Sequence, residues 1–138
     1  MIQRIQTIWL LLAAIFAAVT FRFPFYTGER VINNIASTVD LNATTNIWLS
    51  ILTALVGAVA FVNIFFFDNR KLQLKLCYLG IFVTIILLVL YFLEMTNFTR
   101  GSVALWCLFY FGILAFYILA ARAIWNDQKL IKSMDRLR

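Results

Sequence analysis

The chain has 138 residues, of which 64% are hydrophobic and only 13% are charged, and its net charge is +6. Soluble domains carry about 25% charged residues, so this composition excludes the water-soluble classes and indicates a protein embedded in lipid. The basic residues fall between apolar runs, where the loops that orient membrane helices carry them. This placement explains the positive charge, so we do not expect nucleic acid as a partner.

Four uninterrupted apolar runs dominate the sequence. They cover residues 5–21, 47–67, 76–93 and 103–121. Each has about the 17 to 25 residues with which a helix crosses roughly 30 Å of hydrocarbon. The nearest charges lie just past the ends of these runs: Arg22, Asp68, Glu94 and Arg122. We therefore predict one all-α integral membrane domain over residues 1–138, with four antiparallel transmembrane helices.

Lysine and arginine are distributed unequally on the two sides of these helices. Nine lie on one side: Arg4, Arg70, Lys71, Lys75, Arg122, Lys129, Lys132, Arg136 and Arg138. Three lie on the other: Arg22, Arg30 and Arg100. Because basic loops stay in the cytoplasm, we expect both termini inside and the loop 23–46 outside.

Small residues recur at helical spacing in the first two runs. We expect the first and second helices to pack along this stripe: Ala14, Ala18, Ala54, Gly57 and Ala58. Lipid tails give little drive for helix association, so close backbone contact at small residues is a main cohesive force. The alternative is that one of the two stripes docks an outside helix.

The loop 23–46 is the one connection with room for its own structure. It is entered through Pro24 and contains Asn33-Asn34 between short apolar groups. A small hairpin and a surface-lying helix both fit this pattern.

The outward ends offer few candidates for chemistry. Glu94, at the end of the third run, is a candidate contact for an ion or a lipid headgroup, or else an interfacial carboxylate that reaches water. The carboxylates of Glu29, Asp40 and Glu94 would serve an enzyme only if the first loop folded back over the helices. The chain has no histidine, which excludes the usual zinc sites and the Ser/His and Cys/His pairs. We predict no catalytic residue, no metal and no cofactor.

Aromatic residues crowd the fourth run. Trp106, Tyr110 and Tyr117 fit an interfacial belt, and they would equally line a groove for a lipid chain.

The C-terminal tail, residues 122–138, is predicted to continue the fourth helix as an amphipathic extension, with Lys129, Lys132 and Arg136 between apolar positions. It suits either a tail lying on anionic lipid or a docking helix for a partner.

The two ends of the chain also resemble a known family. The N-terminal motif is Met1-Ile2-Gln3-Arg4-Ile5-Gln6-Thr7, followed by an apolar run. The C-terminal motif comprises Ala121-Arg122-Ala123-Ile124, Asp127, Lys129-Leu130, Ser133 and Asp135-Arg136-Leu137-Arg138. In these motifs the chain resembles the domain-of-unknown-function family 4293 of Bacteroidota. The resemblance implies a small multi-pass protein of the bacterial inner membrane, with no catalytic residue or cofactor assigned.

On the predicted topology the matching terminal residues share the cytoplasmic face. They are the candidate docking residues: Gln3, Arg4, Gln6, Arg122, Asp127, Lys129, Asp135, Arg136 and Arg138. We expect the two ends to pair, Arg4 or Arg136 against Asp135 or Asp127.

The main functional features that the sequence predicts are surfaces for association with other proteins or lipid. We expect a non-catalytic structural or accessory subunit of a larger envelope complex, and not an enzyme. The alternative is a lipid or small-molecule carrier of the membrane. Expected partners are membrane lipid and either a membrane protein or further copies of the chain.

Overall fold

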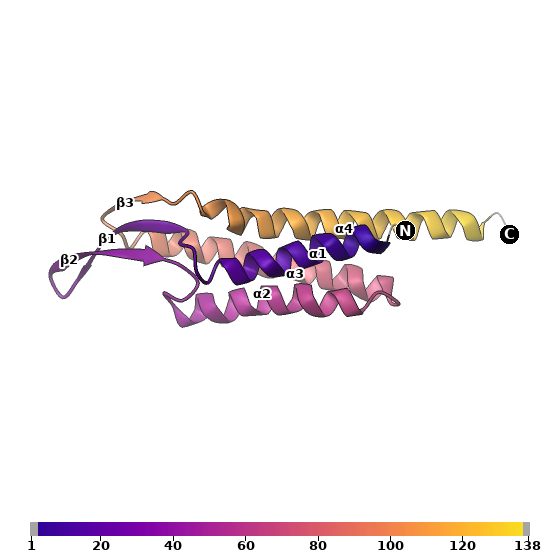
Figure 1. Cartoon of the computed structure of the whole chain (residues 1–138), viewed down its shortest axis with the longest axis horizontal. Helices are drawn as coiled ribbons and strands as arrows, with labels where there is room; N and C mark the ends of the chain where they lie inside the picture. The colour runs from indigo at the N-terminus through magenta and orange to yellow at the C-terminus, as the bar shows by residue number, and fades with distance from the viewer. Residues whose placement is uncertain (1–2, 137–138) are drawn as a thin grey trace.

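A computed structural model describes residues 3–136, with side chains from Ile5 onward. Within this range the chain forms four helices and three strands. The helices are α1 (Gln3–Val19), α2 (Ile47–Phe65), α3 (Arg70–Met95) and α4 (Cys107–Asp135). The strands are β1 (Tyr26–Ile32), β2 (Ile35–Leu41) and β3 (Arg100–Val103). The molecule is elongated, with the helices side by side and the sheet at one end (Figure 1).

Three helices are long and apolar enough to cross a membrane, namely α2, α3 and α4, with 19, 26 and 29 residues. The fourth, α1, is apolar but shorter. Large apolar side chains such as Phe82 and Val89 on α3, and Leu108 on α4, are more than half exposed. Outward-facing apolar surface of this kind suits a lipid solvent. The prediction of a mostly helical chain is therefore confirmed, with three helices that are long and apolar enough to span a membrane. The term all-α needs correction because of the sheet.

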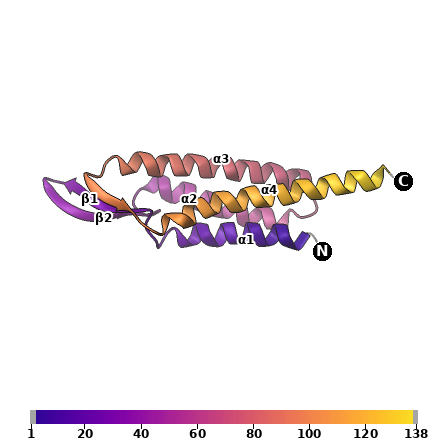
Figure 2. The same ribbon diagram turned by 90° about the horizontal axis from the view of Figure 1, so that it is seen from above.

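Each helix packs against two others. α1 contacts α2 and α4, and α3 contacts the same two helices. Seen from above, α4 lies between α1 and α3 (Figure 2). Tyr117 of α4 fills the centre: it is fully buried, and its hydroxyl donates a hydrogen bond of 2.6 Å to the carbonyl oxygen of Val56 on α2. Its ring occupies the space beside Gly80 of α3, where a Cβ atom would come within 2.3 Å of the ring.

The largest differences from the predicted helix boundaries are at the starts of α3 and α4. α3 begins at Arg70 rather than at residue 76, so its first turn is polar. α4 begins at Cys107 rather than at residue 103, because Val103 belongs to strand β3. α4 then continues without interruption to Asp135, as the amphipathic extension predicted.

The loop 23–46 forms an antiparallel hairpin, so the helical alternative for it was wrong. Ile32 of β1 pairs with Ile35 of β2, and the two residues between them, Asn33 and Asn34, have φ values of 52° and 63°. Asparagine tolerates this left-handed conformation, which two-residue hairpin turns require at both positions.

A third strand, which the sequence pattern did not reveal, completes the sheet. β3 pairs antiparallel with β1, giving the strand order β2-β1-β3. Gly28 of β1 faces Gly101 of β3, and a Cβ atom on Gly101 would lie 2.6 Å from the Cα atom of Gly28. The two glycines thus allow the strands to approach closely at this point.

Candidate functional site

The end of the molecule away from the sheet contains a buried acidic residue. Asp127 of α4 is only 5% exposed, and Gln6 of α1, 4% exposed, donates a hydrogen bond from its amide to the Asp127 carboxyl group. Among the side chains that the structure describes, Asp127 forms no ion pair. Burial of an acidic group is expensive unless it is hydrogen-bonded, so this contact fixes α1 against α4.

This contact corrects one expectation. Gln6 and Asp127 were predicted to face a docking partner, yet they are buried against each other. The two ends of the chain do meet, and among the described side chains they meet through the Gln6 amide. The predicted pairing of Arg4 with an aspartate stays a prediction. Asp135 and Arg136 are exposed, and the side chain of Arg4 lies outside the described residues.

A second polar cluster joins α2 to α3 at the same end. Asn63 is fully buried and donates from its amide to the carbonyl oxygen of Gln73 at 3.2 Å and to the Sγ atom of Cys77 at 3.2 Å. Gln73, 2% exposed, donates in return to the carbonyl oxygen of Asn63 at 3.4 Å. The Oε1 atom of Gln73 is buried and accepts no hydrogen bond. The Oδ1 atom of Asn63 is also buried without a donor, so two acceptors are left unsatisfied in this cluster.

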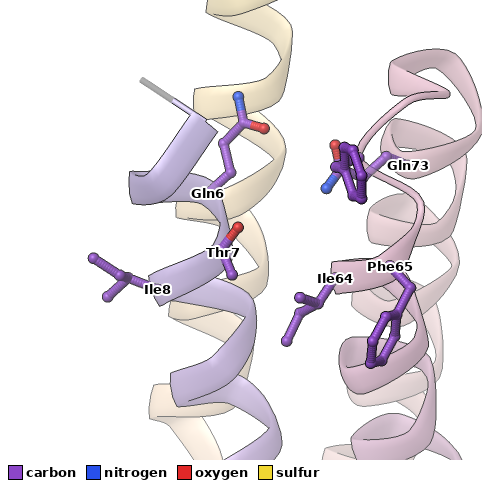
Figure 3. A pocket seen from close by; sticks show the side chains of 7 residues that line it. Gln6, Thr7, Ile8, Ile64, Phe65 and Gln73 are labelled. Carbon is purple, nitrogen blue, oxygen red and sulfur yellow. The ribbon is translucent and has the colours of Figure 1, made fainter. Parts of the chain in front are cut away.

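An open pocket of about 540 Å³ lies between these two clusters. Its polar lining consists of Gln6, Thr7 and Gln73. Its apolar lining consists of Ile8, Ile64, Phe65 and Phe67. Figure 3 shows Gln6 on α1 and Gln73 on α3 extending toward the space between the helices. We call this the Gln6–Gln73 pocket. Its volume lies within the range of about 300 to 1,000 Å³ that is common for ligand sites.

α4 extends past the other helices at the same end (Figures 1 and 2). We call residues 128–135, which follow the Gln6–Asp127 contact, the α4 extension. Its large apolar side chains are exposed: Leu130 53%, Ile131 40% and Met134 68%. Lys129, Lys132 and Asp135 are exposed as well. Of the other predicted docking residues, Arg122 and Arg136 are exposed, while the side chain of Gln3 and all of Arg138 lie outside the described residues.

Glu94 at the sheet end is held by its neighbours. Its carboxyl oxygens accept hydrogen bonds from the amides of Asn46 at 3.0 Å and Asn97 at 3.2 Å. The amide of Asn46 comes from the residue before α2, so this contact joins α2 to the end of α3. These contacts give Glu94 a structural role, and its contact with an ion or a lipid headgroup stays a prediction.

The aromatic residues of α4 do not line an open groove. Tyr110 and Tyr117 are buried, and the Tyr110 hydroxyl donates to the carbonyl oxygens of Thr20 at 3.1 Å and Phe23 at 2.9 Å. Trp106 packs on Phe23, with ring centroids 4.3 Å apart. Tyr110 and Trp106 therefore fix the turn after α1 against the start of α4.

The small residues do lie where α1 meets α2. A Cβ atom on Gly57 would come within 3.3 Å of the Cβ atom of Ala17. Ala14, Ala18, Ala54 and Ala58 line a shallow groove of about 370 Å³ beside this contact. Ala17, in the same stripe of small residues on α1, is thus the residue that lies beside Gly57.

Acidic and sulfur side chains do not gather into a metal site anywhere in residues 3–136. Glu29 and Asp40 are exposed on the sheet, and Asp40 accepts a hydrogen bond of 2.9 Å from Thr27.

A family model described as "Domain of unknown function (DUF4293)" matches residues 2–137, which is nearly the whole chain. The chain belongs to this DUF4293 family. The resemblance of its two terminal motifs is therefore confirmed, and those motifs contain Gln6 and Asp127, the pair that joins α1 to α4. No curated protein and no solved structure is significantly similar to the chain.

Proposed function

We propose that this DUF4293 protein is a non-catalytic accessory subunit of a larger complex in the bacterial inner membrane. Its four helices form an antiparallel transmembrane bundle, with both termini in the cytoplasm and the sheet on the outer side. The excess of lysine and arginine at the end away from the sheet supports this orientation. As a helix of 17 residues, α1 spans about 26 Å, enough for the fourth crossing where the bilayer adapts slightly.

The α4 extension is the observation on which the proposal rests. It leaves the other helices, so none of them covers its apolar side chains, Leu130, Ile131 and Met134. Lys129 and Lys132 are exposed between these side chains. A helix with an apolar face and basic edges fits a partner that offers an apolar groove rimmed by acidic residues. We therefore place the docking surface on this extension.

Extraction of the tagged protein in mild detergent tests the proposal. Native gels and mass spectrometry of the extract should show one partner at a fixed ratio to the protein. Replacing Leu130 and Met134 together by serine removes apolar contact but leaves the helix charges unchanged, so the partner should be lost. Val89→Ser is the matched control, since Val89 is 51% exposed on α3, away from the extension. The proposal fails if the protein is extracted alone, or if the double variant keeps the partner.

A lipid or small-molecule carrier is the second candidate, and the Gln6–Gln73 pocket favours it. A carrier must release its ligand, so purified protein should transfer labelled lipid between donor and acceptor vesicles. Transfer no faster than with protein-free vesicles would eliminate this role. The assay is independent of partner retention and separates the two candidates.

A further inference from the structure

The Gln6–Gln73 pocket has a polar end of defined hydrogen-bonding character. The amide nitrogen of Gln73 is committed to the carbonyl oxygen of Asn63, which fixes the orientation of the amide. Its oxygen is consequently the atom left without a partner, although Gln73 is only 2% exposed. A buried acceptor without a donor is costly, and native structures contain few of them. An occupant that brings an O–H or N–H group would satisfy it.

Gln6 presents the same preference from the opposite wall. Its amide nitrogen donates to Asp127, and its amide oxygen points toward the space between the helices (Figure 3). The Gln6 and Gln73 amides therefore line the pocket from α1 and α3. Such a site accepts hydrogen bonds from the head group of a lipid, whereas a head group without N–H or O–H donors would form no hydrogen bond there.

The remaining walls suit a hydrocarbon chain. Ile8, Ile64 and Phe65 line the pocket below the amides, and the pocket is open on one side. Gln73 lies in the first turns of α3, next to Arg70, Lys71 and Lys75. A phosphate group at this level would find basic side chains within reach of the same helix end.

We propose that the Gln6–Gln73 pocket binds a glycerophospholipid whose head group donates hydrogen bonds, through either an ammonium or a hydroxyl group. One acyl chain lies against Ile64 and Phe65, and the head donates to Gln73 and Gln6. The inference does not depend on the accessory-subunit role, because a lipid can be held permanently by a subunit as well as carried.

Native mass spectrometry of the full-length protein in mild detergent measures this directly. The probes are phosphatidylethanolamine, phosphatidylglycerol and phosphatidylcholine with identical acyl chains. The first two carry donors in the head group, and the third carries none. We expect the donor-bearing lipids to bind roughly three- to tenfold more tightly than phosphatidylcholine, which corresponds to about one hydrogen bond. Equal binding of all three lipids would overturn the proposed recognition.

Two variants connect the preference to the pocket. Gln73→Leu removes the acceptor and should reduce binding of the donor-bearing lipids to the level of phosphatidylcholine. Ile64→Trp fills the apolar wall and should reduce binding of every lipid. Val62→Trp is the matched control, because Val62 lies on the same helix, is 46% exposed and is not part of the pocket lining.

Folding must be monitored separately in each variant. Circular dichroism and gel filtration should give the same helix content and the same size as for the unmodified protein. Should Gln73→Leu fail to fold, Gln73→Met provides the second test: it keeps the length of the side chain but offers no amide oxygen, so the donor-bearing lipids should again bind no more tightly than phosphatidylcholine. An unchanged lipid preference in a folded Gln73 variant would contradict the site, whereas loss of a protein partner would bear only on the subunit proposal.

Discussion

Gln6 and Asp127 form a buried hydrogen bond although they are 121 positions apart in the sequence. Gln6 is the fourth residue of the first helix, and Asp127 lies where the last helix leaves the other three. The bond therefore closes the helical part of the molecule at the end from which the α4 extension starts. It also forms one side of the Gln6–Gln73 pocket.

The Gln6–Asp127 pair predicts that a single variant loses more stability than the double variant. Gln6→Leu leaves the Asp127 carboxyl group buried without a partner, which should lower the free energy of unfolding by about 1–3 kcal/mol. Adding Asp127→Leu removes the orphaned group, so the double variant should regain most of this loss. Thermal unfolding in detergent, followed by circular dichroism, gives the stabilities of the unmodified protein, the two single variants and the double variant, which form a double-mutant cycle. Additive effects of the two substitutions would show that the pair is not coupled.

Tyr117 predicts a strong size limit at Gly80. Gly80→Ala places a Cβ atom within 2.3 Å of the Tyr117 ring, so the ring must move and its hydrogen bond to Val56 is disturbed. We expect a loss of about 1–3 kcal/mol, the usual cost of overpacking. Gly57→Ala is the control: its new Cβ atom meets only the Cβ atom of Ala17, at 3.3 Å, and should cost less. If the two variants unfold at the same temperature, Tyr117 does not constrain Gly80.

The hairpin turn predicts a local effect on the sheet. Asn34→Val forces a β-branched residue into the left-handed region, where the cost is roughly 1–2 kcal/mol, whereas Asn34→Gly should be tolerated. Hydrogen exchange of the β1 and β2 amides measures this change, and the amides of the helices serve as the internal reference. Faster exchange throughout the molecule in the valine variant would indicate that the hairpin is not a separate unit.

The proposed topology predicts opposite labelling of the two ends. In a background with Cys77 and Cys107 replaced by alanine, Thr38→Cys on β2 should react with a membrane-impermeant maleimide in intact spheroplasts. Ser133→Cys, on the α4 extension, should react only after the membrane is opened. Thr38 and Ser133 are both exposed, so a difference in labelling reports the side of the membrane. Labelling of Ser133→Cys in intact spheroplasts would reverse the orientation.

The helices could be predicted because their composition is nearly sufficient to define them. In lipid, an apolar run without a central charge has few alternatives to the α-helix, because its backbone groups must be hydrogen-bonded internally. α2, for example, begins at the predicted residue, Ile47. The hairpin was one of two alternatives, and the pair Asn33-Asn34 was the signal for it. Strand β3 gave no such signal, since its four residues are exposed and depend on pairing with β1.

The buried polar residues could not be predicted from the sequence. Gln6 and Gln73 lie near helix ends, and Asp127 lies beyond the apolar run of α4, at levels where polar residues usually face water or lipid headgroups. Only the packing of α1 on α4 and of α2 on α3 shows that these residues are covered. The burial of Tyr110 and Tyr117 could not be predicted for a similar reason. A tyrosine at the membrane interface and a buried tyrosine with a hydrogen-bonded hydroxyl look the same in the sequence.

The accessory-subunit account is tested most directly by cross-linking in living cells. A photoreactive phenylalanine analogue in place of Met134, which is 68% exposed on the α4 extension, should give one adduct of defined mass with another membrane protein. The same analogue in place of Ile118, 48% exposed on the part of α4 that is proposed to face lipid, should give none. An adduct at position 134 with a second copy of the chain, or with lipid alone, would contradict the account.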